Sequence, residues 1–195
     1  MSSEDGRERI GPGGIALIVG PSGAGKDALI EGARARLATD STFFFAKRII
    51  TRPAHASEAH IPMADADFIS ATRRGAFALS WRAHGTGYGI PIEVDNAVRA
   101  GRLAIANVSR AIIADTRRRY AKAPVVVIDC PIELRAERLA KRGRERADEI
   151  LSRLQRTVDT FNSDAMDFSI DNSGPLEIGV TRLISVLRMI ATSAP

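Results

Sequence analysis

Short strand-like segments rich in apolar residues alternate with longer amphipathic ones along most of the chain. The first apolar segment, 15–19, has the continuous hydrophobicity of a strand that is buried on both faces of a parallel sheet. Alternating strands and helices predict an α/β domain whose parallel sheet is covered by helices on both faces. Further strands are expected at 43–50, 103–107, 125–129 and 168–171, and helices at 27–37, 93–100, 110–120, 132–141, 147–161 and 176–191.

Two stretches fall outside this alternation. Residues 51–91 are rich in His, Gly and Pro, and we expect them to form a smaller subdomain inserted into the sheet topology. Residues 1–12 are polar, charged and Gly-rich, and they lack the apolar core of a signal peptide. We therefore expect a frayed tail there.

The composition fits one globular domain. The chain has 195 residues, of which 45% are hydrophobic and 26% charged. No apolar run approaches the roughly 20 residues that a membrane helix needs, so we expect no membrane association. The single cysteine, Cys130, cannot form an internal disulfide. This fits the reducing cytoplasm, and its apolar surroundings favour a buried, inert thiol.

The charge of the chain favours an anionic partner. The net charge is +5, and only 4 of the 28 basic residues are lysines. Arginine grips phosphate with a planar fork, so this bias suits phosphate handling, although a GC-rich genome would explain it equally well. Aromatic residues make up only 5% of the chain, and they do not alternate with basic ones as a stacking platform for nucleic acid would require.

A phosphate-binding loop is expected directly after the first strand. The segment fits G-x-x-x-x-G-K and opens a helix, which is the context that makes this pattern specific. Successive backbone N–H groups and the positive end of the helix dipole would bind the phosphates of ATP, while Lys26 neutralises charge during transfer. An ordinary Gly-rich turn is the alternative, and the spacing of the lysine argues against it. The loop consists of Gly20, Pro21, Ser22, Gly23, Ala24, Gly25 and Lys26.

The residue after the lysine departs from the usual pattern. A Ser or Thr normally binds Mg²⁺ at this position, and the chain has Asp27 instead. A carboxylate is also a hard oxygen ligand, so Asp27 is our candidate for holding Mg²⁺ directly or through a water. The other interpretation is that Asp27 only complements the helix N-terminus.

Several further segments carry a resemblance to the guanylate kinase superfamily. The phosphate loop followed by Thr51-Arg52-Pro53 is the first of these. An Arg-rich segment, 135–145, lies where such kinases carry a lid. The others are the block 75–81 (Gly-Ala-Phe-Ala-Leu-Ser-Trp) and the segment 87–91 (Gly-Tyr-Gly-Ile-Pro).

This resemblance implies a P-loop NTPase fold of the nucleoside monophosphate kinase type. The whole chain, 1–195, would form one guanylate-kinase-like domain with a five-stranded parallel core sheet. A substrate-binding subdomain would occupy about 51–92 and a mobile Arg-rich lid about 142–148.

Two departures from guanylate kinases concern the acceptor. Where those enzymes read the guanine edge with acidic residues, the alignment places Ser80 and Asn107. Neither side chain carries the negative charge that pairs with guanine N–H donors, so GMP is not expected as the substrate. Arg48 replaces a small hydroxyl residue, which suits a smaller and more highly phosphorylated ligand.

One branch of the superfamily matches these features closely. Gly-Pro-Ser-Gly-x-Gly-Lys-Asp (20–27), Ile-Thr-Arg-Pro (50–53), Phe-Ala-Leu-Ser-Trp-x-Ala-His-Gly (77–85), Tyr-Gly-Ile-Pro (88–91) and Asn-Val-Ser-Arg (107–110) resemble the ribose 1,5-bisphosphate phosphokinases. These enzymes of phosphonate degradation make 5-phosphoribosyl 1-diphosphate with ATP. An Asp after the lysine is typical of them. The resemblance thus implies ATP and Mg²⁺ as cofactors and a small sugar phosphate as substrate.

Within this interpretation, individual residues receive roles. Arg48 and Arg52 are first choices for gripping the acceptor phosphates, with a surface salt bridge as the alternative for each. Tyr88 matches a family position that contacts phosphate, and His84 lies in a matching block. Arg110 either faces the substrate or begins a solvated helix. Ser80 and Asn107 complete the expected acceptor site.

The Arg-rich segment supplies the remaining candidates. Arg142 and Arg144 flank a glycine that could act as a hinge, so we expect them to close over ATP and the transferring phosphoryl group. Arg153 lies one helix face away and is expected to reach the same group. Arg135 and Arg138 are expected to be solvent-facing charges.

Two other functions stay open at this point. One is a guanylate or other nucleoside monophosphate kinase, and the other is a non-catalytic guanylate-kinase-like binding module. The intact Gly25-Lys26 pair and the Arg-rich segment argue against the module. The partner expected here is a small sugar phosphate, without nucleic acid or membrane, in the cytoplasm. A homodimer is left open.

Overall fold

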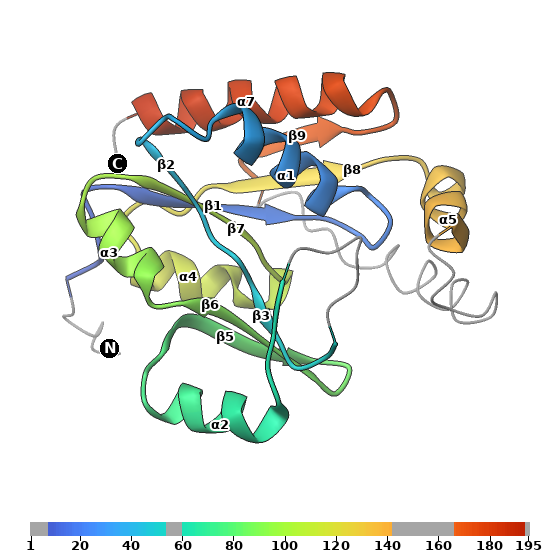
Figure 1. The fold of residues 1–195 in the computed structure, drawn as a ribbon. Coiled ribbons are helices and arrows are strands. Elements are labelled where there is room, and N and C mark those ends of the chain that lie inside the picture. Colours follow the sequence, from blue (N-terminus) through green and yellow to red (C-terminus); the bar gives the residue numbers. More distant parts are fainter. Residues whose placement is uncertain (1–7, 54–59, 142–165, 194–195) are drawn as a thin grey trace, which may run out of the picture.

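The computed structural model describes residues 8–53, 60–141 and 166–193. Its centre is a parallel sheet of five strands in the order β2-β7-β1-β8-β9 (Figure 1). The strands, in chain order, are β1 (Gly14–Val19), β2 (Phe43–Phe45), β7 (Leu103–Asn107), β8 (Val125–Asp129) and β9 (Phe168–Asp171).

The central strand β1 shows why the sheet is covered on both faces. All six of its residues are buried, and successive side chains enter two different hydrophobic clusters. Ala16 and Ile18 pack with the helices α1 (Lys26–Arg36) and α7 (Leu176–Thr192). Leu17 lies on the opposite face, with α3 (Glu93–Arg99), the 3₁₀ turn η1 (Arg110–Ile112) and α4 (Ile113–Arg119). The five-stranded parallel α/β core expected from the sequence is therefore confirmed.

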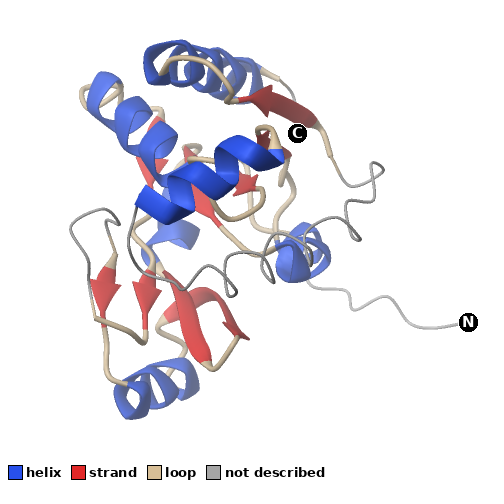
Figure 2. Ribbon diagram, turned by 90° about the vertical axis from the view of Figure 1, so that its right-hand side faces the viewer, coloured by secondary structure: helices blue, strands red, loops and turns tan. Residues whose placement is uncertain are grey.

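A second, four-stranded sheet lies beside the main one in the order β4-β3-β6-β5. Helix α2 (Asp65–Arg73) covers the side of this sheet that faces away from the main sheet, as both ribbon views show (Figures 1 and 2). Buried residues of β5 and β6 join the cluster beneath the main sheet, which attaches the smaller unit firmly. Its strands are β3 (Ile49–Ile50), β4 (Ile61–Pro62), β5 (Phe77–Ala83) and β6 (Thr86–Pro91).

Three sequence expectations about the elements need correction. The single strand expected at 43–50 is two strands, because β2 pairs with β7 in the main sheet while β3 pairs with β6 in the smaller one. The single helix expected at 110–120 is the turn η1 followed by α4. Residues 51–91 hold more regular structure than we described, including α2 and a β5–β6 hairpin.

Three remaining expectations, the tail at 1–12, the helix at 147–161 and the lid at 142–148, fall wholly or partly outside the described residues. Residues 1–7 of the expected tail lie outside the described residues, whereas Ile10 is tied by a backbone bridge to Tyr120. Helix α5 (Ile132–Lys141) ends where the description stops. The expected helix at 147–161 and the expected lid at 142–148 therefore lie outside the described residues. Across the segments that are described, no helix has the length and apolar character needed to cross a membrane.

Candidate functional site

The expected phosphate loop joins the carboxyl end of β1 to the first turn of α1. Gly20, Gly23 and Gly25 all have positive φ angles, of 146°, 84° and 90°. A Cβ atom at Gly20 would overlap the Ile128 carbonyl oxygen of the neighbouring strand β8. The loop can therefore make this close turn only with glycine at that position. Its placement at a helix N-terminus suits the binding of an anion.

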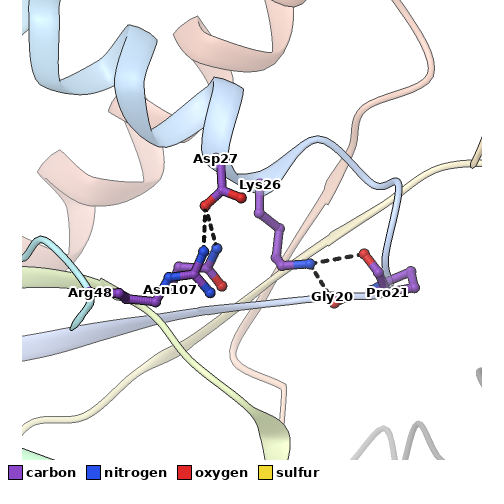
Figure 3. A network of polar contacts seen from close by, with 6 residues as sticks. All are labelled: Gly20, Pro21, Lys26, Asp27, Arg48 and Asn107. Carbon is purple, nitrogen blue, oxygen red and sulfur yellow. Dashed lines mark hydrogen bonds and ion pairs between the residues drawn. The ribbon is translucent and has the colours of Figure 1, made fainter. Parts of the chain in front are cut away.

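Lys26 folds back over this loop. Its Nζ donates hydrogen bonds to the carbonyl oxygens of Gly20, at 2.7 Å, and Pro21, at 2.9 Å (Figure 3). The ammonium group is thus held on the loop, where it can meet a phosphate bound by the backbone N–H groups.

Next to the lysine, three of the expected site residues meet at one carboxylate oxygen. Asp27 Oδ1 accepts hydrogen bonds from Arg48 Nη2, at 3.0 Å, and from Asn107 Nδ2, at 2.7 Å (Figure 3). Asp27 belongs to α1, Arg48 directly precedes β3, and Asn107 ends β7. The Asp27 side chain is 30% exposed and that of Arg48 only 13% exposed. The charges are therefore partly shielded from water, so they attract each other more strongly than an exposed pair would.

The chemistry of this corner fits a magnesium ion. Mg²⁺ binds oxygen ligands and usually takes only one or two carboxylates, with waters and substrate phosphates completing its shell. Asp27 supplies such a carboxylate beside the phosphate loop. Within the described segments, no group of three or more His, Cys, Asp and Glu side chains could hold a metal by itself. Asp27 therefore stays the candidate for holding Mg²⁺ together with waters and substrate phosphates.

Three residues behind the loop, Asn172, Arg138 and Arg135, were missed or misassigned from the sequence. Asn172, which is 4% exposed, donates from Nδ2 to the Ala24 carbonyl oxygen at 2.8 Å. Arg138 Nη2 donates to the Asn172 carbonyl oxygen at 3.0 Å. Arg135 is only 8% exposed, so the expectation of a solvent-facing charge is wrong for it, and Arg138 is half-buried. Both lie on the side of α5 that carries buried Leu139, so the packing of this helix, which their charges do not reveal, sets their burial.

Cys130 lies in the same region and is buried, as expected. Burial raises the pKa of its thiol, against the opposing effect of the nearby Arg138 and Arg135 charges. A raised pKa leaves little thiolate at neutral pH, which agrees with a structural residue.

The expected acceptor residues of the smaller sheet gather around strands β3 and β6. Tyr88 stacks on Trp81, with ring centroids 5.3 Å apart. The segment after β3 is tied to β6, because Thr51 N–H donates to the Gly87 carbonyl and Gly87 N–H donates to Thr51 Oγ1 at 2.8 Å. These bonds fix the start of the chain that carries Arg52.

His60, which the sequence did not single out, lies against Arg52 in the structure. The imidazole is 8% exposed, and its Nε2 lies 3.3 Å from the Arg52 carbonyl oxygen. That contact requires the proton on Nε2, while Nδ1 is buried and has no hydrogen-bond partner among the described residues. No periodic pattern of residues around His60 reveals this contact in the sequence.

The other expected residues take different positions. His84 and Gly85 form the tight turn of the β5–β6 hairpin, with φ angles of 49° and 73°, and His84 is exposed. Ser80 pairs with Gly89 in the hairpin and is exposed. Arg110 is half-buried at the first position of η1, directly after β7. Arg142, Arg144 and Arg153 lie outside the described residues.

Comparison with known proteins places this site in context. No protein-family model matches the chain. A ribose 1,5-bisphosphate phosphokinase PhnN from Bradyrhizobium diazoefficiens is 41% identical over 179 residues, covering 92% of this chain and 90% of that protein. The protein of the same name from Brucella melitensis is 43% identical over 180 residues, covering 92% and 94%. That from Acidiphilium cryptum is 47% identical over 154 residues, covering 79% and 82%.

A solved structure supports the fold independently. Guanylate kinase from Anaplasma phagocytophilum superposes with a TM-score of 0.64 at 18% identity, covering 93% of this chain and 87% of that one. Such a distant likeness concerns the fold alone and agrees with the P-loop kinase architecture. Sequence identity above 40% over about nine-tenths of both chains is far more specific. On that similarity, the chain belongs to the ribose 1,5-bisphosphate phosphokinase (PhnN) family.

Proposed function

We propose that this protein transfers the γ-phosphoryl group of ATP to ribose 1,5-bisphosphate and forms 5-phosphoribosyl 1-diphosphate. The observation that carries the proposal is the contact of Asp27, directly after the phosphate loop, with Arg48 and Asn107. Arg48 is shielded from water, and Asn107 is an amide where guanylate kinases have an acidic residue that binds the guanine base. Membership of the PhnN family supports the same reaction.

The reaction requires little acid–base chemistry from the protein. An oxygen of the phosphate on the anomeric carbon attacks the γ-phosphorus, and the bond from that phosphorus to the β,γ-bridging oxygen breaks. ADP leaves with the electron pair of this bond. Because the attacking oxygen already carries negative charge, no general base is needed, and the protein contributes positioning and charge neutralisation.

On the donor side, the backbone N–H groups of residues 20–27 would bind the ATP phosphates. Lys26 would exchange its bonds with the Gly20 and Pro21 carbonyls for the β- and γ-phosphate oxygens. Asp27 would hold Mg²⁺ directly or through a water. Bound there, the ion would neutralise the charge that develops on the phosphates.

On the acceptor side, we assign Arg48 and Arg52 to the phosphates of the sugar. Arg48 reaches Asp27 from the position just before β3, and the backbone carbonyl of Arg52 is held by His60. The Tyr88 hydroxyl, at the edge of the stack with Trp81, would bind a phosphate oxygen. Arg110, three residues after the end of β7, would add charge on the same side.

Asn107 and Ser80 would set the acceptor specificity because neither side chain carries the negative charge that binds a guanine base. The amide of Asn107 donates to Asp27, so it stabilises a carboxylate instead of supplying one. A guanine base would leave its N–H donors without anionic acceptors here, which is costly in a closed site. His84 lies in an exposed hairpin turn, so we assign it to the rim of the acceptor site.

Three further parts of the proposal concern the chain as a whole. Arg142, Arg144 and Arg153 would close over ATP as a lid at 142–148 and neutralise the transferring phosphoryl group. The single domain 1–195 would carry its acceptor-binding subdomain at 51–92. A cytoplasmic setting agrees with the free thiol of Cys130.

Competition between two acceptors tests this function. Purified protein is given ATP, Mg²⁺ and either ribose 1,5-bisphosphate or GMP, and the products are identified by mass. We expect 5-phosphoribosyl 1-diphosphate and ADP from the sugar bisphosphate, with no GDP above background. Turnover of GMP alone would assign the chain to nucleotide phosphorylation and show that Ser80 and Asn107 do not exclude the base.

A further inference from the structure

One ion pair connects the nucleotide half of the site with the acceptor half. Asp27 is the second residue of α1 and follows the lysine of the phosphate loop, whereas Arg48 leads into β3 of the smaller sheet. The two side chains meet at 3.0 Å, and Asn107 binds the same oxygen, Oδ1, at 2.7 Å (Figure 3). A change in the charge or position of either side chain therefore alters the electrostatic energy of the other.

In the proposed reaction, each member of the ion pair would bind a ligand instead of its partner. Asp27 would bind the Mg²⁺ of ATP, and Arg48 would bind a phosphate of the acceptor. A divalent cation beside the carboxylate weakens its attraction for the guanidinium and repels the guanidinium itself. An anionic phosphate beside Arg48 competes with Asp27 in the same manner.

We infer that the Asp27–Arg48 ion pair couples the two half-sites, so that Mg·ATP and the phosphorylated acceptor each tighten the binding of the other. The ligand that binds first must break the pair. The second ligand then finds its partner already released and does not bear that cost, which is the condition for positive coupling. This inference rests on the proposed function.

Asn107 acts as a positioning residue in this exchange. Its Nδ2 donates to Asp27 Oδ1 at 2.7 Å, and this bond does not depend on Arg48, so it would remain when Arg48 leaves. The carboxylate thus keeps one donor and its orientation toward the phosphate loop. The exchange also selects the acceptor, because only a ligand with an anionic group at Arg48 can replace the carboxylate there. A neutral sugar would leave the pair closed and would not raise the affinity for Mg·ATP.

The coupling is measurable by calorimetry without turnover. A non-hydrolysable ATP analogue with Mg²⁺ is titrated into the protein, with and without saturating ribose 1,5-bisphosphate. We expect the acceptor to tighten analogue binding roughly 5- to 30-fold in the unmodified protein, within the usual range for coupled sites. With the analogue and EDTA in place of Mg²⁺, the factor should fall, because no cation then competes for Asp27.

Two variants remove the ion pair from opposite sides. Asp27→Asn keeps the shape of the side chain and removes its charge, and Arg48→Gln removes the cation. In each variant, the coupling factor should fall to within about two-fold of unity, even though the individual affinities also change. If one variant fails to fold, the other still tests the inference.

Asp65→Asn is the matched control, because it makes the same chemical change in the exposed Arg82–Asp65 pair of the smaller unit. It should keep the coupling of the unmodified protein. A factor near unity in the unmodified protein, or an undiminished factor in both Asp27→Asn and Arg48→Gln, would overturn the inference while leaving the proposed function intact. If ribose 1,5-bisphosphate does not bind the unmodified protein under any condition, both are wrong.

Discussion

The contact between Asn172 and the phosphate loop allows a quantitative prediction. Asn172 lies after β9 and donates to the carbonyl oxygen of Ala24, a residue that is fully buried inside the loop. Asn172→Ala removes this hydrogen bond and leaves the carbonyl with Arg138 Nη1, at 3.5 Å, as a distant donor. The phosphate loop would then lose its hydrogen bond to the C-terminal part of the chain.

The magnitude follows from the burial of these groups. A buried acceptor that loses its donor costs about 1–3 kcal/mol, and the small cavity left by the amide adds to this. We therefore expect the free energy of unfolding to fall by about 2–3 kcal/mol. For a chain of this size, such a loss lowers Tm by roughly 4–12 °C. Because the loop is also less well ordered before binding, Mg·ATP should bind about ten-fold more weakly.

The assay combines thermal unfolding with calorimetric titration of Mg·ATP. Ser173→Ala is a matched control at the next position, where the exposed hydroxyl bonds Asp171 at 2.7 Å. Its Tm should stay within about 2 °C of the unmodified protein, since exposed substitutions usually cost less than 0.5 kcal/mol. Equal stability and equal ATP affinity for Asn172→Ala and Ser173→Ala would refute the reasoning that Asn172 anchors the loop.

Three further residues, Tyr120, His60 and Cys130, allow predictions of stability, ligand affinity and thiol reactivity. Tyr120→Phe removes a hydroxyl that donates to buried Asp95 at 2.5 Å, so urea unfolding should show a loss of about 1.5–3 kcal/mol with ATP affinity unchanged. Burial, followed by the hydrogen bond to Asp95 and the Asp95 charge, raises the pKa of Tyr120, so the native state keeps a proton that the unfolded chain releases near pH 10. Stability should therefore fall as pH rises past about 10, and the fall should be smaller in Tyr120→Phe. His60→Ala should weaken acceptor binding about ten-fold with Mg·ATP affinity kept, because His60 positions Arg52, and equal losses for both ligands in calorimetry would argue for general destabilisation. Finally, Cys130 should react with a thiol reagent only upon unfolding, and rapid labelling of the native protein would contradict its raised pKa and burial.

The sequence predicted the core elements well where one strand or helix is bounded by its own turn residues. β7, β8, β9 and α5 have the predicted bounds. The expectation of one strand at 43–50 missed a change of sheet, because Phe45 pairs with Ile105 while Ile49 pairs with Gly89. Such a change depends on partners distant in the sequence, and hydrophobic periodicity within one segment does not contain it.

In the candidate site, too, local sequence predicts some features, while others depend on residues distant in the sequence. The loop and Lys26 are recognisable because their spacing is local. That Asp27 and Asn107 share a hydrogen bond across 80 positions depends on the parallel order of the strands. The burial of Arg135 depends on how α5 packs, so the charge of the residue alone led to the wrong expectation.

The central claim is phosphoryl transfer from ATP on this loop to a sugar phosphate. ATP labelled in its γ-phosphate is incubated with the protein, Mg²⁺ and ribose 1,5-bisphosphate, and the label is followed into 5-phosphoribosyl 1-diphosphate. We predict transfer by the unmodified protein and a loss of at least about 100-fold in Lys26→Ala, whose phosphate contacts are needed in the transition state. No labelled product from the unmodified protein, or undiminished transfer by Lys26→Ala, would contradict the claim.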